Sequence, residues 1–235
     1  MTLIKAKYGE LKGPWLPSSA GSASALIILL HGYGANGLDL FGMAEPIRQA
    51  LGDQTIAIWS PDAPEPLPGA DEFFAQSAYQ WFPLSTLDRD DMKHHVKAVV
   101  PIVRDAILAA TAALDLPMSK VVVLGFSQGG MVALETCLAL NDSVAAVIGL
   151  STSYLGEGSD AVLKSKPAVT LVHGDADPVI PPASLQMAVE DLSVAGIKAE
   201  AHLLPALQHG IDQRAFDIAI SAIASGLGST KAAGH

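Results

Sequence analysis

A glycine–x–serine–x–glycine segment at residues 125–130, Gly-Phe-Ser-Gln-Gly-Gly, constrains the fold more than any other feature. The apolar run 121–124 precedes it, and an apolar, helix-forming stretch at 131–140 follows it. Strand, sharp turn and helix in this order are typical of a turn that strains the backbone of a serine and exposes its hydroxyl. The flanking residues must be small, and Gly125 and Gly129 satisfy this. The alternative is a glycine-rich turn that only packs a helix on a strand.

Short apolar runs alternate with helix-forming stretches along the whole chain. Because these runs are continuous rather than alternating, they predict strands covered on both faces, as in a parallel sheet. We therefore expect one α/β domain over residues 1–235, with a mostly parallel twisted sheet, helices on both faces and a flexible tail from about 225. Residues 1–24 indicate one or two short strands, Pro46 should interrupt a helix and Pro101 should kink or break another. The expected strands are 25–30, 55–59, 121–124, 144–150, 168–172 and 197–204, and the expected helices are 38–51, 91–114, 131–140, 182–195 and 211–226.

Composition excludes several classes of protein. The 235 residues carry a net charge of −10, which argues against nucleic acid or an anionic membrane surface as a main partner. The one cysteine, Cys137, excludes an internal disulfide and a thiolate metal cluster. The N-terminus has no apolar signal region, and the run 25–30 is too short to span a bilayer. We expect a soluble, cytoplasmic protein without stable membrane insertion.

Four polar loops follow predicted strands, at 31–37, 125–130, 173–181 and 205–210. Ligands of such sheets bind outside the carboxyl ends of the strands, so these loops should open onto one edge. Their convergence is stronger evidence for a site than any single motif.

A serine hydroxyl becomes a nucleophile when a base lies within hydrogen-bond reach and a carboxylate orients that base. Ser127 has candidate acids at Asp175 and Asp177. Asp177 is favoured because it precedes a proline, which holds its backbone extended. Asp175 would lie in the turn itself, where an aspartate more often caps backbone N–H groups. His209 is the expected base, since it lies alone in a loop between the last strand and a helix. The other histidines fit strand ends, a strand interior, a surface helix or the tail.

An oxyanion formed at such a site needs backbone N–H donors. The loop His31-Gly32-Tyr33-Gly34 should supply one from Tyr33, and Gln128 should supply another at the start of the helix. The alternative for the first loop is an ordinary strand-to-helix turn. Acyl transfer by these groups requires neither a metal nor an organic cofactor.

The long loop 60–84 is rich in proline and carries many apolar side chains. Long loops in compact domains are often functional, and this one could form a wall over an apolar substrate. The alternative is a satellite core beneath the loop. The candidate substrate-binding residues are Leu67, Phe73, Phe74 and Trp81.

The motifs at 31–34, 80–82, 125–130, 173–178 and 209–210 together resemble the phospholipase/carboxylesterase family of α/β-hydrolases, which includes bacterial carboxylesterases and acyl-protein thioesterases. The resemblance covers nearly the whole chain. It implies an α/β-hydrolase fold without a large cap domain, a Ser127–Asp177–His209 triad, and hydrolysis of carboxylic esters, thioesters or lysophospholipids as small-molecule substrates. Many members dimerise, so a homodimer is an expectation. Ala35 departs from the aspartate that many relatives carry there. The alternative from another class is a non-catalytic binding protein with the hydrolase fold.

Overall fold

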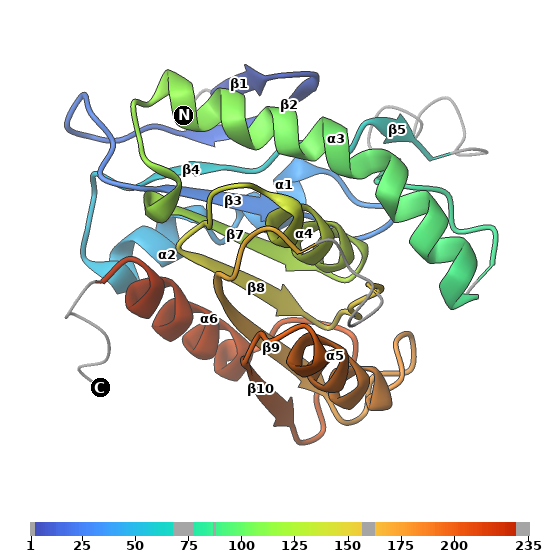
Figure 1. The fold of residues 1–235 in the computed structure, drawn as a ribbon. Helices are drawn as coiled ribbons and strands as arrows, with labels where there is room; N and C mark the ends of the chain where they lie inside the picture. Colours follow the sequence, from blue (N-terminus) through green and yellow to red (C-terminus); the bar gives the residue numbers. More distant parts are fainter. Residues whose placement is uncertain (1–2, 68–77, 87, 157–162, 229–235) are drawn as a thin grey trace.

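An eight-stranded sheet forms the centre of the computed structural model (Figure 1). The structure describes residues 3–67, 78–86, 88–156 and 163–228. The strand order across the sheet is β1-β2-β4-β3-β7-β8-β9-β10. These strands are β1 (Lys5–Tyr8), β2 (Leu11–Leu16), β3 (Leu26–Leu30), β4 (Ala57–Trp59), β7 (Val121–Phe126), β8 (Ala146–Leu150), β9 (Ala168–Gly174) and β10 (Ala199–Leu204).

The six strands from β4 to β10 run parallel, and β2 pairs antiparallel with both β1 and β4. The expected mostly parallel sheet is therefore confirmed, as are the two short strands near the N-terminus. A second, two-stranded sheet joins β5 (Glu65–Pro66) to β6 (Tyr79–Gln80) within the 60–84 loop. In the described part of the chain, no separate helical cap domain is inserted between these elements.

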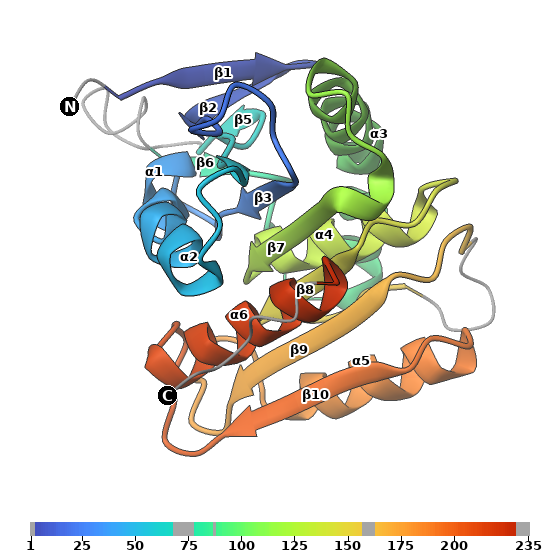
Figure 2. The same cartoon turned by 90° about the vertical axis from the view of Figure 1, so that its left-hand side faces the viewer.

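Helices cover both faces of the sheet, as Figures 1 and 2 show. Along β3, Leu26, Ile28 and Leu30 pack into the core beneath α3, α4 and α5, whereas Ile27 and Leu29 pack into the core beneath α1, α2 and α6. This two-sided burial explains the continuous apolar runs in the sequence. The helices are α1 (Gly37–Phe41), α2 (Ala44–Leu51), α3 (Arg89–Ala113), α4 (Gln128–Ala139), α5 (Ala183–Val194) and α6 (Gln213–Gly226), with a short 3₁₀ turn, η1 (Met118–Lys120).

Two prolines lie inside helices that they do not break. Pro46 does not interrupt a helix, because it is the third residue of α2, where the backbone N–H has no partner within the helix. The break falls instead at Gly42, which ends α1. Pro101 lies inside the 25-residue helix α3, which does not end there. Buried valines on both sides, Val96, Val99 and Val103, hold the helix on the sheet despite the lost hydrogen bond.

The ends of the chain also refine the prediction. The helix α6 continues to Gly226, so residues 225 and 226 belong to it and not to the predicted tail. Residues 229–235 lie outside the described residues. No helix in the described ranges is long and apolar enough to cross a membrane.

Candidate active site

Ser127 lies at the turn between β7 and α4 with φ 53° and ψ −120°. A non-glycine residue with this backbone geometry is strained by about 1–3 kcal/mol, and the surroundings must hold it in place. A Cβ on Gly125 would lie 2.3 Å from the Gly129 carbonyl oxygen, and one on Gly129 would lie 2.1 Å from that of Leu30. Both glycines are therefore required by backbone crowding. Thr152 fixes the turn further, since its hydroxyl donates to the Ser127 carbonyl oxygen at 2.7 Å.

His209 connects the serine to a carboxylate. Its Nε2 lies 3.0 Å from Ser127 Oγ, and its Nδ1 lies 2.8 Å from Asp177 Oδ2. An ionised carboxylate only accepts hydrogen bonds, so Nδ1 carries the proton and Nε2 is free to accept from the serine hydroxyl. The imidazole also packs against the ring of Phe126, with centroids 4.9 Å apart. These contacts join a hydroxyl, an imidazole and a carboxylate in the order that catalysis by a serine nucleophile requires.

Asp177 has a buried side chain, and its second oxygen is occupied as well. Oδ1 accepts hydrogen bonds from the N–H groups of Val179 at 2.8 Å and Ile180 at 2.9 Å. Burial raises the pKa of this carboxyl, but the hydrogen bonds from His209 and these two N–H groups together outweigh it and hold the pKa below its ordinary value. Asp177 therefore faces His209 as a fixed negative charge.

Asp175, the other candidate acid, binds a backbone N–H group of a turn. Its Oδ1 accepts from the N–H of Ala206 at 2.6 Å, so it caps a turn as the sequence suggested.

A second histidine, His173, lies close to the Asp177 carboxylate, and its side chain is almost fully buried. Its Nε2 donates to the Ile180 carbonyl oxygen at 3.0 Å and lies 3.4 Å from Asp177 Oδ2. The N–H of this second imidazole therefore faces the same carboxylate oxygen as His209.

The loop after β3 brings its backbone beside the serine. A Cβ on Gly32 would lie 3.4 Å from the Ser127 Cβ. His31 fixes this loop, because its Nδ1 donates to the Gly32 carbonyl oxygen at 2.8 Å and its Nε2 accepts from the N–H of Ala63 at 3.0 Å. Burial lowers the pKa of the His31 imidazole, which agrees with a neutral ring in this role. The Tyr33 side chain is 43% exposed at the surface of the same loop.

Gln128 joins the serine turn to the 60–84 loop. Its side-chain oxygen accepts from the N–H of Trp81 at 2.9 Å, and its side-chain nitrogen donates to the Phe82 carbonyl oxygen at 2.7 Å. Two further backbone bonds, from Gly34 to Tyr79 at 2.9 Å and from Tyr79 to Ala35 at 2.8 Å, tie this loop to the one after β3. Gln128 is the first residue of α4, and the first N–H groups of a helix have no acceptor within the helix.

The four substrate-binding candidates have different locations. Leu67 is half-buried and reaches Gly34, whose added Cβ would lie 3.9 Å from it. Trp81 is 1% exposed, packs in the core, and donates from its indole N–H to the His31 carbonyl oxygen at 2.8 Å. This placement corrects the expectation that Trp81 belongs to a wall over the substrate, because its side chain packs in the main core beneath α3, α4 and α5. Phe73 and Phe74 lie outside the described residues.

Comparison with known proteins identifies the family of this chain. The sequence profile described as phospholipase/carboxylesterase matches residues 13–226. The chain belongs to the phospholipase/carboxylesterase family. Its similarity to this family therefore extends from β2 to the end of α6.

Three relatives illustrate the similarity. Esterase YpfH of Escherichia coli K12 is 27% identical over 199 residues, which cover 84% of this chain and 81% of the relative. Acyl-protein thioesterase 1 of Candida albicans is 28% identical over 177 residues, covering 70% and 75% respectively. The crystal structure of esterase PE8 aligns with a TM-score of 0.82 and 32% identity, covering 90% of this chain and 97% of PE8.

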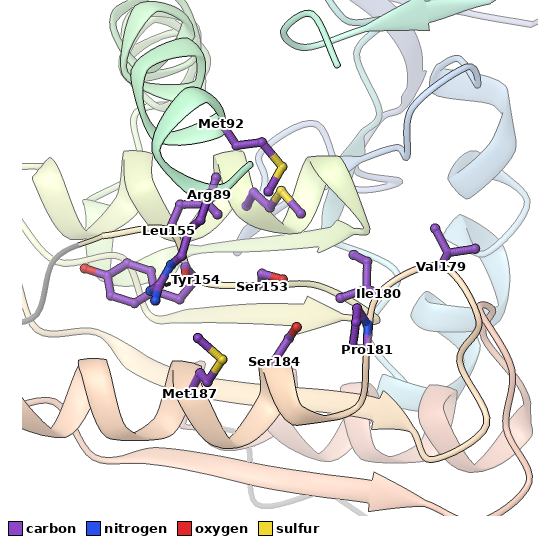
Figure 3. A pocket seen from close by; sticks show the side chains of 11 residues that line it. Arg89, Met92, Ser153, Tyr154, Leu155, Val179, Ile180, Pro181, Ser184 and Met187 are labelled. Carbon is purple, nitrogen blue, oxygen red and sulfur yellow. Dashed lines mark hydrogen bonds between the residues drawn. The ribbon is translucent and has the colours of Figure 1, made fainter. Parts of the chain in front are cut away.

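This member of the family also has a pocket that the sequence did not reveal (Figure 3). Its volume is about 330 Å³, and it lies between the N-terminal end of α3, the first turn of α4 and the first turns of α5. The segments that follow β8 and β9 complete its walls. Six of its lining residues are Met92, Met131, Ser153, Ile180, Ser184 and Met187.

Sequence reasoning missed several residues of the site. Thr152 follows β8, so the rule that pointed to the other strand-end loops could have found it. The side-chain roles of Gln128 and His173 depend on partners far away in the sequence or across a turn, and no spacing pattern indicates them.

Proposed function

We propose that this protein is a serine hydrolase that cleaves carboxylic esters or acyl thioesters through an acyl-enzyme on Ser127. The observation that supports this most strongly is the continuous set of hydrogen bonds from Ser127 Oγ through His209 to Asp177, at 3.0 and 2.8 Å. The names of the relatives, an esterase and an acyl-protein thioesterase, agree with these two substrate classes. Lysophospholipids, which are also carboxylic esters, are a further candidate substrate.

In the proposed first step, His209 Nε2 takes the proton from Ser127 as Oγ attacks the carbonyl carbon. The carbonyl π electrons move to oxygen, and the resulting oxyanion is bound by the backbone N–H groups of Tyr33 and Gln128. Removal of one such donor typically costs about a hundred- to a thousandfold in rate. When the tetrahedral intermediate collapses, the bond to the alcohol or thiol breaks and His209 donates its proton to the leaving atom.

In the second step, water replaces the alcohol or thiol. His209 takes a proton from the water as it attacks the acyl-enzyme, and then returns that proton to Ser127 Oγ as the carboxylic acid leaves. The strained turn keeps the serine at the mouth of the site in both steps. Asp177 keeps Nδ1 protonated and stabilises the imidazolium that forms in each.

A fluorophosphonate probe, read by intact mass, tests this proposal. We expect one adduct on the parent protein and none on Ser127→Ala, with much slower labelling of His209→Ala. Ser193→Ala is the matched control, because Ser193 is exposed on α5 and should leave labelling unchanged. Hydrolysis of p-nitrophenyl acetate should follow the same pattern.

An adduct that persists on Ser127→Ala would refute the choice of nucleophile. A parent protein that neither labels nor hydrolyses esters would instead support the non-catalytic binding protein.

A further inference from the structure

We propose that Trp81 is a positioning residue for the oxyanion site, because it fixes the backbone donor of Tyr33 relative to that of Gln128. This inference rests on the proposed function, which assigns those two N–H groups to the oxyanion. It gives Trp81 a role that differs from the substrate wall expected from the sequence. Trp81 acts through the two donor segments and is itself 1% exposed.

The two donors belong to different segments of the chain. Tyr33 lies in the loop after β3 between Gly32 and Gly34, and Gly34 has a φ of +77°. Because glycines allow many backbone conformations, this loop is not rigid by itself. Gln128 instead lies in the first turn of α4. Contacts from outside the loop must therefore fix Tyr33 relative to the helix, since a misplacement of about 1 Å can cost about a hundredfold in rate.

Trp81 is hydrogen-bonded to both segments. Its indole N–H donates at 2.8 Å to the carbonyl oxygen of His31, which leads into the loop of Tyr33. Its backbone N–H donates at 2.9 Å to the side-chain oxygen of Gln128. One residue of the core therefore links the two donor segments through two buried hydrogen bonds.

The Tyr33 N–H lies between two points at which its loop is held. Before it, the His31 carbonyl oxygen accepts from the Trp81 indole. After it, the N–H of Gly34 donates to the Tyr79 carbonyl oxygen at 2.9 Å. Because the chain is held on both sides of Tyr33, the N–H of this residue keeps one direction.

Gln128 is held by the same part of the chain. Its side-chain nitrogen donates to the Phe82 carbonyl oxygen at 2.7 Å, and its side-chain oxygen accepts from Trp81. These two bonds use both ends of the amide and fix its orientation. The backbone of Gln128, with the N–H at the start of α4, therefore keeps its place relative to the residues that hold Tyr33.

An ester and a thionoester with the same acyl group and the same p-nitrophenol leaving group test this role. In the thionoester, sulfur replaces the carbonyl oxygen, and sulfur is a weak hydrogen-bond acceptor. The ratio of kcat/KM for the ester to kcat/KM for the thionoester therefore reports how well the oxyanion donors are placed. A variant that only lowers the amount of folded protein reduces both values equally and leaves the ratio unchanged.

Trp81→Phe removes the indole N–H and keeps an aromatic ring in the core. We expect kcat/KM for the ester to fall by about tenfold or more, with a smaller fall for the thionoester. Trp59→Phe is the matched control, because Trp59 is fully buried and its indole N–H has no partner among the described residues. It should leave the activity and the ratio close to those of the parent.

Gln128→Met is the second variant. Methionine has a similar length, but it offers only a weak acceptor to Trp81 and no donor to Phe82. Gln128→Met should therefore lower the ester-to-thionoester ratio as Trp81→Phe does. Because both variants act on the same pair of donors, the double variant should lose less activity than the product of the two single losses.

A ratio that stays at the parent value in both Trp81→Phe and Gln128→Met would overturn the positioning role. An equal loss in Trp59→Phe would also overturn it, because the effect would then come from core packing. Fluorophosphonate labelling separates the two proposals. An unlabelled parent contradicts the proposed function, whereas a labelled parent whose ratio does not change in the variants contradicts only the role of Trp81. A labelled parent that cleaves both substrates equally well contradicts the oxyanion donors and this inference with them.

Discussion

Replacing Asp177 by asparagine changes one carboxylate oxygen into an NH₂ group, and the surrounding donors decide which oxygen is replaced. The N–H groups of Val179 and Ile180 both need an acceptor at Oδ1. The amide oxygen should therefore remain there, and the NH₂ group should take the place of Oδ2, facing His209 Nδ1. Because an amide NH₂ only donates, Nδ1 must become the acceptor and the proton must move to Nε2.

The reversed tautomer cannot accept the proton of Ser127. Loss of the correct tautomer in a comparable triad lowers kcat by about 10⁴-fold, which corresponds to about 5 kcal/mol of transition-state stabilisation. We expect a loss of this size for Asp177→Asn in p-nitrophenyl acetate hydrolysis, with little change in the free energy of unfolding. If the amide rotated the other way, two buried N–H groups would lose their acceptor and stability would fall by about 1–3 kcal/mol for each.

Asp175→Asn is the matched control, because Asp175 caps a turn through Ala206 and does not contact His209. Its kcat should stay close to that of the parent protein. A loss of less than about tenfold for Asp177→Asn, with a normal unfolding midpoint, would refute the tautomer argument.

Two further predictions concern stability. Gly129→Ala should lower the free energy of unfolding, measured in urea, by about 3 kcal/mol or more, because the new Cβ would overlap the Leu30 carbonyl oxygen. Gly42→Ala is the control and should be nearly neutral, because a Cβ there would have no contact under 3.7 Å. Burial raises the pKa of the Glu135 carboxyl from 4.5 to about 7, so the folded state binds a proton that the unfolded chain releases, and stability should fall by about 3 kcal/mol between about pH 4.5 and 7. Glu135→Gln should remove this loss of stability between about pH 4.5 and 7, and a variant whose stability falls as steeply as that of the parent over this range would contradict the assignment.

The sequence predicted the features that depend on local constraints. Gly125 and Gly129 had to be small because the serine turn crowds its own backbone, and the structure has those close approaches. The continuous apolar runs predicted the parallel sheet because each strand is covered on both faces. The motif order predicted the family, and the polar strand-end loops predicted that Ser127, Asp177 and His209 would meet.

Features that depend on tertiary packing were not predictable in this way. Trp81 was expected in a wall over the substrate because its loop is rich in apolar side chains. Nothing near it in the sequence shows that Gln128, 47 residues away, accepts its backbone N–H. The pocket is assembled from three helices and two strand-end segments, so its methionines and serines share no spacing. Pro101 could not be judged from propensity alone, since the buried face of α3 offsets the missing hydrogen bond.

The way the 60–84 loop is attached has a consequence for how this protein could diversify. Its hydrogen bonds with the Gln128 side chain and with the loop after β3 use backbone atoms of Tyr79, Trp81 and Phe82, and the Trp81 indole adds one more to the His31 carbonyl oxygen. Among the described loop residues, exposed side chains such as Glu65 and Pro66 can therefore change without loosening these hydrogen bonds, whereas Trp81 and Phe82 are fixed by the core. One side chain of the serine turn, Gln128, therefore both accepts from and donates to this loop, so a change at Gln128 would release the loop and disturb the turn at the same time.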